Sequence, residues 1–406
     1  MSMSDSPPDK IRDKSLVLIA LILWGVMFVV GTAHVVRDIR YQNECLIYAQ
    51  ATSDWWAGRD MYLATWTGDY LHYDPAGIDS FLYFPHAAIL YTPFALLGHP
   101  VGDVVWRFLG LSLFCHSLWL MSKLLSPNHA LRVFALGSFV AMAPAYNSLH
   151  NAQVNLPLAA VMVYTTVALT QKRWWRAVGW LMLGLALKPI IFVMILLVGA
   201  VYRPMRWRLA LPLAFFFLLP FATQNFHYVL SAYHQCRMKL SRASHPNRAF
   251  SDLRGLIWKL GWIIPFSLLA VFQVIAAAAT LVLCFIATRR WKEPAMSAFV
   301  LMLTACYLML FNPRTEGNSY VILAPVIALP AALLFLDPRR HLAAWVLVGI
   351  AFCLTGNLWA YRLTLHWLKP LACVVFVILM VRELLRKSIQ DWPLVMPRGI
   401  EEAVVA

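Results

Sequence analysis

Charged residues are scarce in this sequence: 13% of its 406 residues are Asp, Glu, Lys or Arg, whereas 61% are hydrophobic. With a mean hydropathy of +0.66, the chain lacks the polar surface that a single water-soluble domain of this length needs. Apolar runs long enough to cross a bilayer core of about 30 Å recur from residue 15 onward. The sequence therefore predicts an all-α polytopic membrane protein.

The chain also lacks the motifs of metal, redox and nucleotide chemistry. Its seven cysteines are scattered without a CxxC spacing, which indicates packing residues rather than a disulfide framework or a metal site. No Walker loop, GxGxxG after a strand, HExxH or DxD pair occurs in the sequence. We therefore expect neither a metal nor a cofactor.

The net charge of +15 comes from short basic clusters between apolar runs, such as QKRWWR at 171–176 and YRPMRWR at 202–208. This pattern favours membrane orientation over nucleic-acid binding, because short basic loops stay in the cytoplasm. Placing all the clusters inside predicts ten spans with both termini cytoplasmic. The spans are expected at about 15–36, 103–124, 131–149, 152–170, 208–222, 262–287, 294–312, 319–336, 342–360 and 366–383.

Two apolar pieces are too short for ordinary spans. One is 84–98, and the other is 177–201, which Lys188-Pro189 divides into two halves. Proline removes a helix hydrogen bond and disfavours helix at the preceding residue, so the second piece is expected to form two half-depth helices. Broken helices at membrane depth normally line a cavity. The whole of 15–385 is then a single transmembrane domain between cytoplasmic tails at 1–14 and 386–406.

This topology gathers the polar, non-repetitive sequence on the extracytoplasmic side. The outer loops are expected at 37–83, 146–155, 223–261, 312–320 and 356–367. They hold nearly all the acids that do not neighbour cytoplasmic arginines, so the polar chemistry is expected on the periplasmic or lumenal face. A nucleotide sugar, which is confined to the cytoplasm, would be on the wrong side.

Several short stretches occur in a distinctive order: an acid in the first outer loop, GRDMY, FLYFPHAAILYTPFALLG, HNAQVNLPLAAVMV and LGLALKPIIFVMILLV. From about residue 40 to 335 this order resembles the C-type-fold membrane glycosyltransferases, and specifically glycosyltransferase family 87, the polyprenol-phosphate-mannose-dependent mannosyltransferases. In that family an acid opens a helix, a Tyr follows four residues later, and a G-x-x-x-Y follows about fourteen residues on. Glu44, Tyr48, Gly58 and Tyr62 have these spacings, with Glu44 in place of the family's catalytic Asp.

The resemblance implies inverting transfer of a sugar from a polyprenyl-phosphate donor to a hydroxyl of a lipid-linked or glycan acceptor. The sugar would be mannose or another hexose or pentose, and the lipid-linked sugar is a co-substrate rather than a cofactor. Glu44 is then the general base that takes the hydroxyl proton. On a helix, Glu44 and Tyr48 share a face, whereas Asp54 points about 80° away. The alternative is that Glu44 is one solvated charge on an interfacial helix.

Other polar residues are candidates for the donor. Arg314, Lys188, Arg254 and Arg242 are cations that could meet the leaving phosphate. His86 could also contact that phosphate, and Glu316 the donor sugar. Lys188 could instead snorkel from a helix end, Arg314 and Glu316 could form a structural pair, and Asn151 could cap a helix. Possible further substrate contacts are Tyr48, Tyr62, Tyr83, Asn151, Gln153, Asn155, Asn318, Tyr320 and Asp252.

The expected partners are the polyprenyl-phosphate sugar, a glycolipid or glycan acceptor and the lipid bilayer, without nucleic acid. The expected location is the bacterial inner membrane, with the active site facing the periplasm. A secondary transporter or a flippase of lipid-linked glycans is the competing hypothesis, since broken helices and a buried Lys also suit transport. Against a transporter, the two halves of the sequence show no repeat.

Overall fold

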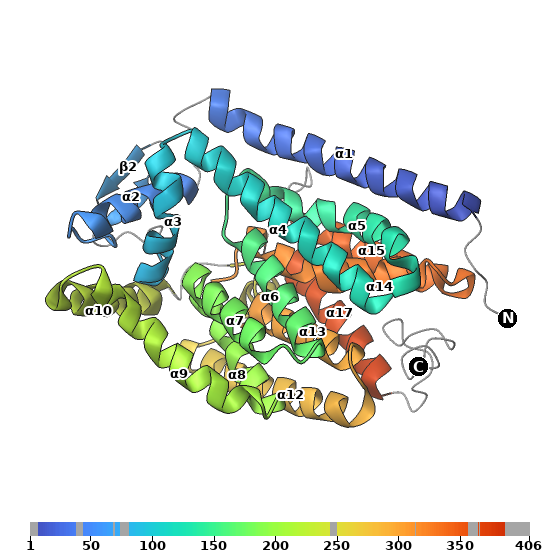
Figure 1. Cartoon of the computed structure of the whole chain (residues 1–406). Helices are drawn as coiled ribbons and strands as arrows, with labels where there is room; N and C mark the ends of the chain where they lie inside the picture. Colours follow the sequence, from blue (N-terminus) through green and yellow to red (C-terminus); the bar gives the residue numbers. More distant parts are fainter. Residues whose placement is uncertain are drawn as a thin grey trace.

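The computed structural model describes residues 7–37, 44–67, 70–73, 81–243, 250–312, 314–355, 364 and 366–385. These residues form sixteen α-helices, several short 3₁₀ segments and a two-stranded hairpin (Figure 1). The α-helices are α1 Pro7–Arg37, α2 Glu44–Trp56, α3 Pro85–Leu97, α4 Val101–Leu125, α5 Ala130–His150, α6 Asn155–Thr170, α7 Trp174–Leu187, α8 Phe192–Val201, α9 Met205–Leu218, α10 Phe226–Ala243, α11 Leu253–Lys259, α12 Phe266–Arg290, α13 Ala295–Phe311, α14 Ala324–Leu334, α15 His341–Cys353 and α17 Leu368–Leu385.

Within the described ranges, five helical segments are long and apolar enough to cross a membrane. They are Ile11–Arg37, Val101–Leu125, Met205–Ala222, Ser267–Arg290 and Gly317–Leu334. Val101–Leu125 is α4, and Ser267–Arg290 lies in α12. Gly317–Leu334 consists of the 3₁₀ segment η4 (Gly317–Leu323) and α14. The chain is therefore a polytopic integral membrane protein, as predicted. The path of ten crossings and its orientation stay predictions.

Helices buried on all sides form the centre of the bundle. Every side chain from Asn155 to Leu169 in α6 is buried, and α13 and α14 are almost as completely enclosed. In Figure 1, α6 and α13 lie between α1, which runs along one edge, and α9 and α12 along the other. α1 and α12 expose rows of Leu, Ile and Val. A helix that is apolar all round fits an interior position, whereas exposed apolar faces at the periphery fit contact with lipid.

The predicted first outer loop was expected to be helical, but it also contains strands. After α2, residues Ala64–Thr67 (β1) and Tyr70–Tyr73 (β2) form an antiparallel hairpin with Ala64 opposite Tyr73. Its sequence is rich in Thr, Trp and Tyr, residue types that favour strands, and this local preference was missed. The fold is thus helical apart from this hairpin among the described residues.

The break expected at Lys188-Pro189 is present. α7 ends at Leu187, Lys188 is extended with φ −156° and ψ 129°, and a 3₁₀ turn (η2, Pro189–Ile191) leads into α8. Because proline cannot supply the amide that would continue the helix, the chain changes direction here. Lys188 thus lies outside a regular helix, and its side chain reaches Asn155, the first residue of α6.

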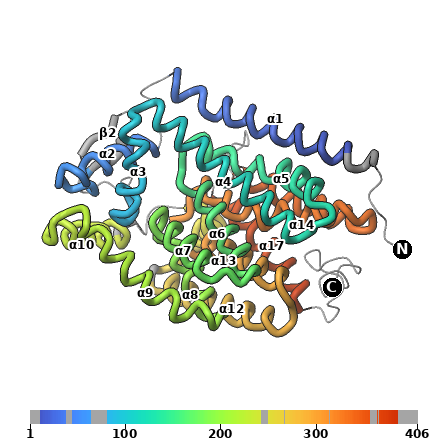
Figure 2. Tube along the Cα trace, in the orientation of Figure 1, coloured from blue at the N-terminus to red at the C-terminus, as the bar shows by residue number. Residues whose placement is uncertain are grey.

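One end of the molecule collects elements from the segments predicted to be outer loops. α2, β2, α3 and α10 gather at the left of Figures 1 and 2, although α10 is far from the others in sequence. The Gln224 side-chain amide donates to the Trp55 carbonyl oxygen at 2.7 Å, and the Tyr228 hydroxyl donates to the Arg59 carbonyl oxygen at 2.6 Å. These bonds fasten α10 and the turn before it to the C-terminal end of α2.

Candidate active site

A polar cluster forms where four segments that are distant in the sequence converge. They are the first residue of α2, the turn between α5 and α6, the break after α7 and the turn before η4. The cluster comprises Glu44, Gln153, Asn155, Lys188, Arg314, Glu316 and Ser319. Six of these seven were candidates from the sequence, and Ser319 was not.

Gln153 joins two carboxylates. Its Nε2 atom donates to Glu44 Oε1 at 3.3 Å and to Glu316 Oε2 at 2.9 Å. Glu44 therefore lies close to Glu316 although the two come from opposite parts of the chain. The pair could not be expected from spacing, because it depends on how α2 docks against the turn before η4.

A chain of hydrogen bonds continues from Gln153 to a cation. Asn155 Nδ2 donates to Gln153 Oε1 and, at 3.3 Å, to Ser319 Oγ. Lys188 Nζ donates to Asn155 Oδ1 at 2.8 Å. Each amide has its orientation fixed by its neighbours, so the cluster is an ordered network rather than a set of independent side chains.

Arg314 closes the other side of the cluster, with its Nε atom 3.3 Å from Glu316 Oε1. The structural pairing of Arg314 with Glu316 considered from the sequence is thus formed. It does not exclude substrate contact, because both side chains retain solvent exposure.

The electrostatic surroundings give the two acids different proton affinities. Burial, followed by the negative charge of Glu316, raises the pKa of Glu44 to about 7, although Lys188, Arg314 and the Gln153 hydrogen bond oppose the rise. Burial also acts to raise the pKa of Glu316, but Arg314 and Lys188 outweigh it and lower that pKa below its ordinary value. Near neutral pH, Glu316 is ionised while Glu44 can both take up and release a proton.

Two residues of α4 hold the turn that carries Gln153. Trp106 Nε1 donates to the Ala152 carbonyl oxygen at 3.0 Å, and Arg107 donates to the carbonyl oxygens of Leu149 and His150, both at 3.1 Å. The neighbouring Asn151 carbonyl oxygen accepts the Glu44 backbone amide at 3.3 Å. Trp106 and Arg107 were not among the candidates from the sequence. Arg107 could have been one, because a charged residue inside an apolar span usually has a functional or structural partner.

Asn151 itself ends α5, where its amide donates to the Asn147 carbonyl oxygen at 3.0 Å. Ala152 then adopts a left-handed conformation, with φ 55°, and α6 starts at Asn155. The turn explains how Gln153 and Asn155, spaced by two, can meet in one network: they do not lie on one regular helix.

Asp54 and Asp60, the other two acids among the described residues 44–67, have local partners. Asp54 is fully buried and accepts from Arg59 Nε at 2.8 Å and from Gln50 Nε2 at 3.1 Å. Asp60 accepts from the Tyr62 backbone amide at 2.9 Å, which shapes the turn after α2. Both carboxylates hold local structure, whereas Glu44 faces the cluster.

Three predicted tyrosines pack together behind Glu44. The hydroxyl oxygens of Tyr48 and Tyr83 are 3.1 Å apart, and the Tyr62 hydroxyl donates to the Tyr83 carbonyl oxygen at 2.9 Å. Burial, and after it the Glu44 carboxylate, raises the pKa of Tyr83. The tyrosines thus form a buried aromatic group close enough to Glu44 to feel its charge.

The remaining predicted residues are distributed around this centre. His86, in α3, stacks on Phe216 of α9 with the two ring centres 3.7 Å apart. Its Nε2 atom lies 2.7 Å from the Phe216 carbonyl oxygen. Asp252 caps α11 by accepting from the Gly255 amide at 2.8 Å, and Arg254 is buried in the same helix. Asn318 is half-buried in η4, and the Arg242 side chain lies outside the described residues. The roles expected for these residues stay predictions.

Tyr320 connects the cluster to the segment that precedes α11. Its hydroxyl donates to the Ser251 carbonyl oxygen at 2.8 Å, and the Ser251 amide donates to the Thr315 carbonyl oxygen at 2.8 Å. These two bonds fix the turn that presents Arg314 and Glu316.

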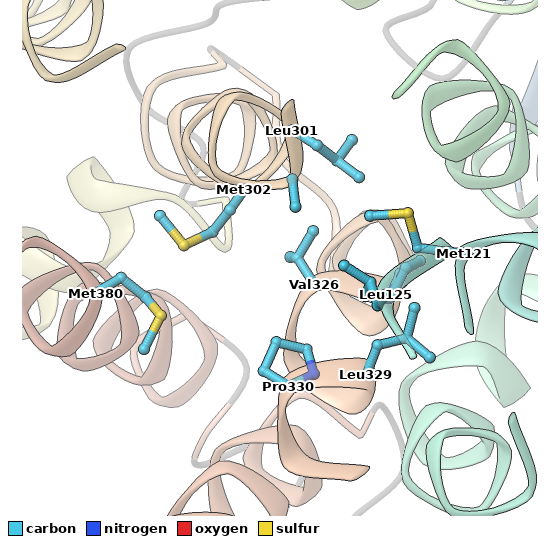
Figure 3. Close-up of a pocket in the computed structure, with 10 residues that line it drawn as sticks. Met121, Leu125, Leu301, Met302, Val326, Leu329, Pro330 and Met380 are labelled. Atoms are coloured by element: carbon cyan, nitrogen blue, oxygen red, sulfur yellow. The ribbon is translucent and has the colours of Figure 1, made fainter. Parts of the chain in front are cut away.

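An apolar cavity lies elsewhere in the bundle, enclosed by side chains of α4, α13, α14 and α17 (Figure 3). Met121, Met302 and Met380 point toward it, and its volume is about 20 Å³. This space is about that of one water molecule and carries no acid or base, so it is unsuited to a sugar substrate. No group of three or more His, Cys, Asp or Glu side chains within the described ranges could hold a metal ion.

The fold and the cluster define a polytopic membrane protein with a site built from paired carboxylates and cations. Residues 81–313, slightly more than half of the chain, match the family model described as Glycosyltransferase family 87, and the chain belongs to this family. It is therefore an enzyme, and membership implies glycosyl transfer that depends on a lipid-linked sugar. None of the curated proteins matches the sequence. Glu44, Arg314 and Glu316 lie outside the matched range, so the geometry alone joins them to Gln153 and Lys188.

Proposed function

We propose that this enzyme moves a sugar, with inversion, from a polyprenyl-phosphate donor to a hydroxyl of a lipid-linked or glycan acceptor, with Glu44 as general base. The observation that carries the proposal is the contact of Glu44 and Glu316 with one Gln153 amide. A carboxyl whose pKa is about 7 can accept a proton from the acceptor near neutral pH and release it afterwards.

The proposed reaction is a direct displacement at the anomeric carbon. The acceptor oxygen forms a bond to that carbon as its proton passes to Glu44, while the bond between the carbon and the phosphate oxygen breaks. The products are the glycosylated acceptor and polyprenyl phosphate. Glu316 stays ionised beside Arg314 and makes Glu44 more basic, and Gln153 fixes the direction in which the Glu44 carboxylate points.

The cations on the donor side are proposed to meet the charge that develops on the phosphate. Lys188 and Arg314 are in the cluster, and Arg254 lies in the segment joined to it through Tyr320 and Ser251. Fixed cations stabilise the negative charge that develops on the lipid phosphate as it leaves. Arg242, as a cation of the predicted second long outer loop, and His86, where the predicted first outer loop re-enters the membrane, are proposed as further donor contacts.

The site is proposed to face the periplasm of a bacterial inner membrane, with both termini in the cytoplasm. Its support is the alternation of basic loops and apolar runs along the sequence. Mannose is the first sugar to test, followed by other hexoses and pentoses.

The deciding experiment supplies purified protein with a glycolipid extract as acceptor and a panel of radiolabelled polyprenyl-phosphate sugars, and measures the release of free polyprenyl phosphate. Wild-type protein should cleave at least one donor, and Glu44→Gln should reduce kcat by about 100- to 10,000-fold while still binding that donor. Asp60→Asn is the matched control, because asparagine can still accept from the Tyr62 amide. Full activity in Glu44→Gln would remove Glu44 from the base role. Transport of an intact donor without release of polyprenyl phosphate would favour a flippase instead.

A further inference from the structure

The cations of the cluster are already balanced by its acids. Glu44 and Glu316 carry two negative charges when ionised, and Lys188 and Arg314 carry two positive ones. A polyprenyl-phosphate sugar adds one more negative charge at its phosphodiester. The leaving polyprenyl phosphate gains another as the sugar departs, while the acceptor proton neutralises Glu44, so the site keeps one excess negative charge throughout. A cation next to the cluster that is not matched by these acids would offset that charge.

Lys369 is such a cation, and no motif in the sequence marks it. It lies in the first turn of α17 with only 3% of its surface exposed. Its Nζ atom donates to the Gly317 carbonyl oxygen at 2.9 Å and lies 5.9 Å from the centre of the Tyr320 ring. Both partners are uncharged.

Lys369 has no carboxylate partner among the ion pairs of the described residues. The sequence from 338 to 382 contains neither Asp nor Glu, so the residues flanking Lys369 along the chain cannot supply one. A buried ammonium without a counter-charge is costly, and one carbonyl oxygen offsets only part of that cost. Since an ammonium has three N–H groups, two more can bind an anion.

The contact with Gly317 places Lys369 beside the active site. Gly317 directly follows Glu316. The turn around these two residues is held by the hydrogen bonds from Ser251 to Thr315 and from Tyr320 to Ser251. Arg314, Glu316, Gly317 and Asn318 retain partial exposure, so a ligand can approach this turn.

We propose that Lys369 binds the phosphate of the lipid-linked donor and of the polyprenyl phosphate product, an inference that rests on the function proposed above. The phosphate oxygens accept the N–H groups that Gly317 leaves available. Because negative charge grows on the phosphate as the glycosidic bond breaks, Lys369 stabilises the leaving group more than the bound donor.

The test compares Lys369→Gln and Lys369→Arg with the wild-type enzyme in the assay of polyprenyl phosphate release. Loss of a charge-assisted hydrogen bond predicts that Lys369→Gln weakens competitive inhibition by added polyprenyl phosphate by about 10- to 100-fold and lowers kcat/KM by at least as much. Lys369→Arg should recover part of both values. Lys259→Gln removes an exposed lysine from the end of α11 and should leave both values unchanged.

Thermal unfolding separates ligand binding from a structural role. Polyprenyl phosphate should raise the Tm of wild type and Lys369→Arg but not of Lys369→Gln, since a ligand stabilises only the protein that binds it. A Lys369→Gln enzyme with a lowered Tm but an unchanged inhibition constant would overturn the proposal. If that variant does not fold, the wild-type enzyme still decides: equal inhibition by polyprenyl phosphate and by uncharged polyprenol would also overturn it.

Two further ligands, inorganic phosphate and phosphatidylglycerol, test whether Lys369 binds the phosphate of the donor or that of another molecule. Inorganic phosphate should compete weakly with the donor in wild type and not in Lys369→Gln. Phosphatidylglycerol that raises the wild-type Tm as much as polyprenyl phosphate would assign Lys369 to bulk lipid and overturn the donor assignment. If the wild-type enzyme cleaves no donor of the panel, the proposed function itself fails. If the wild-type enzyme cleaves a donor and Lys369→Gln has the same kinetics, the proposed function stands and only the role of Lys369 is overturned.

Discussion

Glu44 and Glu316 accept hydrogen bonds from the same nitrogen atom, Gln153 Nε2, at 3.3 and 2.9 Å. The two carboxylates differ in charge state because Arg314 and Lys188 favour the ionised form of Glu316, whereas burial and Glu316 favour the protonated form of Glu44. This asymmetry suits a base next to a permanently charged neighbour, and it makes the pH dependence of the enzyme informative.

Activity should rise with pH through the pKa of Glu44, because only the ionised carboxylate accepts the acceptor proton. We expect the acidic limb of kcat/KM to have its midpoint near pH 7 in the wild-type enzyme. Glu316→Gln removes a negative charge that raises this pKa, so the limb should move to lower pH in the residual activity. The profile is measured from pH 5 to 9 with saturating acceptor. An unshifted limb would show that Glu316 does not act on the base.

Replacement of Gln153 should move the same limb in the opposite direction. The amide hydrogen bond lowers the pKa of Glu44, and Gln153→Leu removes that bond while the two carboxylates stay close. The limb should therefore move to higher pH, with a fall in kcat because Glu44 is less well oriented. Gln171→Leu, at the exposed end of α6, is the control and should leave the profile in place. A shift to lower pH would contradict the arrangement.

Ionisation of Glu44 should lower the free energy of unfolding at alkaline pH. Its folded pKa of about 7 exceeds its ordinary value of 4.5, so the folded state holds a proton that the unfolded state has lost between these values. The contribution of Glu44 is fully favourable below pH 4.5 and is lost as the pH rises through 7. Glu44→Gln should then have a higher Tm than wild type at pH 8, and the difference should shrink at pH 5. An equal difference at both values would argue against a raised pKa.

Arg107→Met should disturb the active site from a distance. It removes the hydrogen bonds to the Leu149 and His150 carbonyl oxygens and leaves Asp103 without a nearby guanidinium. We expect a loss of about 2–4 kcal/mol in the free energy of unfolding. Activity should fall as well, because the adjacent Asn151 carbonyl oxygen orients the amide of Glu44. Unfolding in a detergent titration measures the first effect and donor turnover the second. Arg132→Met, which breaks a pair with Asp13, is the control for loss of an arginine and should keep its kcat.

The sequence predicted the helical membrane class and the break at Lys188, because hydrophobic length and proline chemistry act locally. It also singled out Glu44, Gln153, Asn155 and Lys188, although each came from a different argument. Their meeting at one network depends on docking between elements that are far apart in the chain, which no local pattern encodes. Lys369 was missed for the same reason: its significance comes from the uncharged surroundings that the fold gives it.

The hydrogen bonds of Gln153 have a consequence for biosynthesis. They connect Glu44, near the beginning of the chain, with Glu316, which the ribosome adds only after about three quarters of the sequence has been made. A nascent chain that has inserted α1 to α13 holds the proposed base but not its charged neighbour. More than three quarters of the chain must therefore be made before the acid pair exists, and a shorter copy in the membrane has only one half of the candidate site.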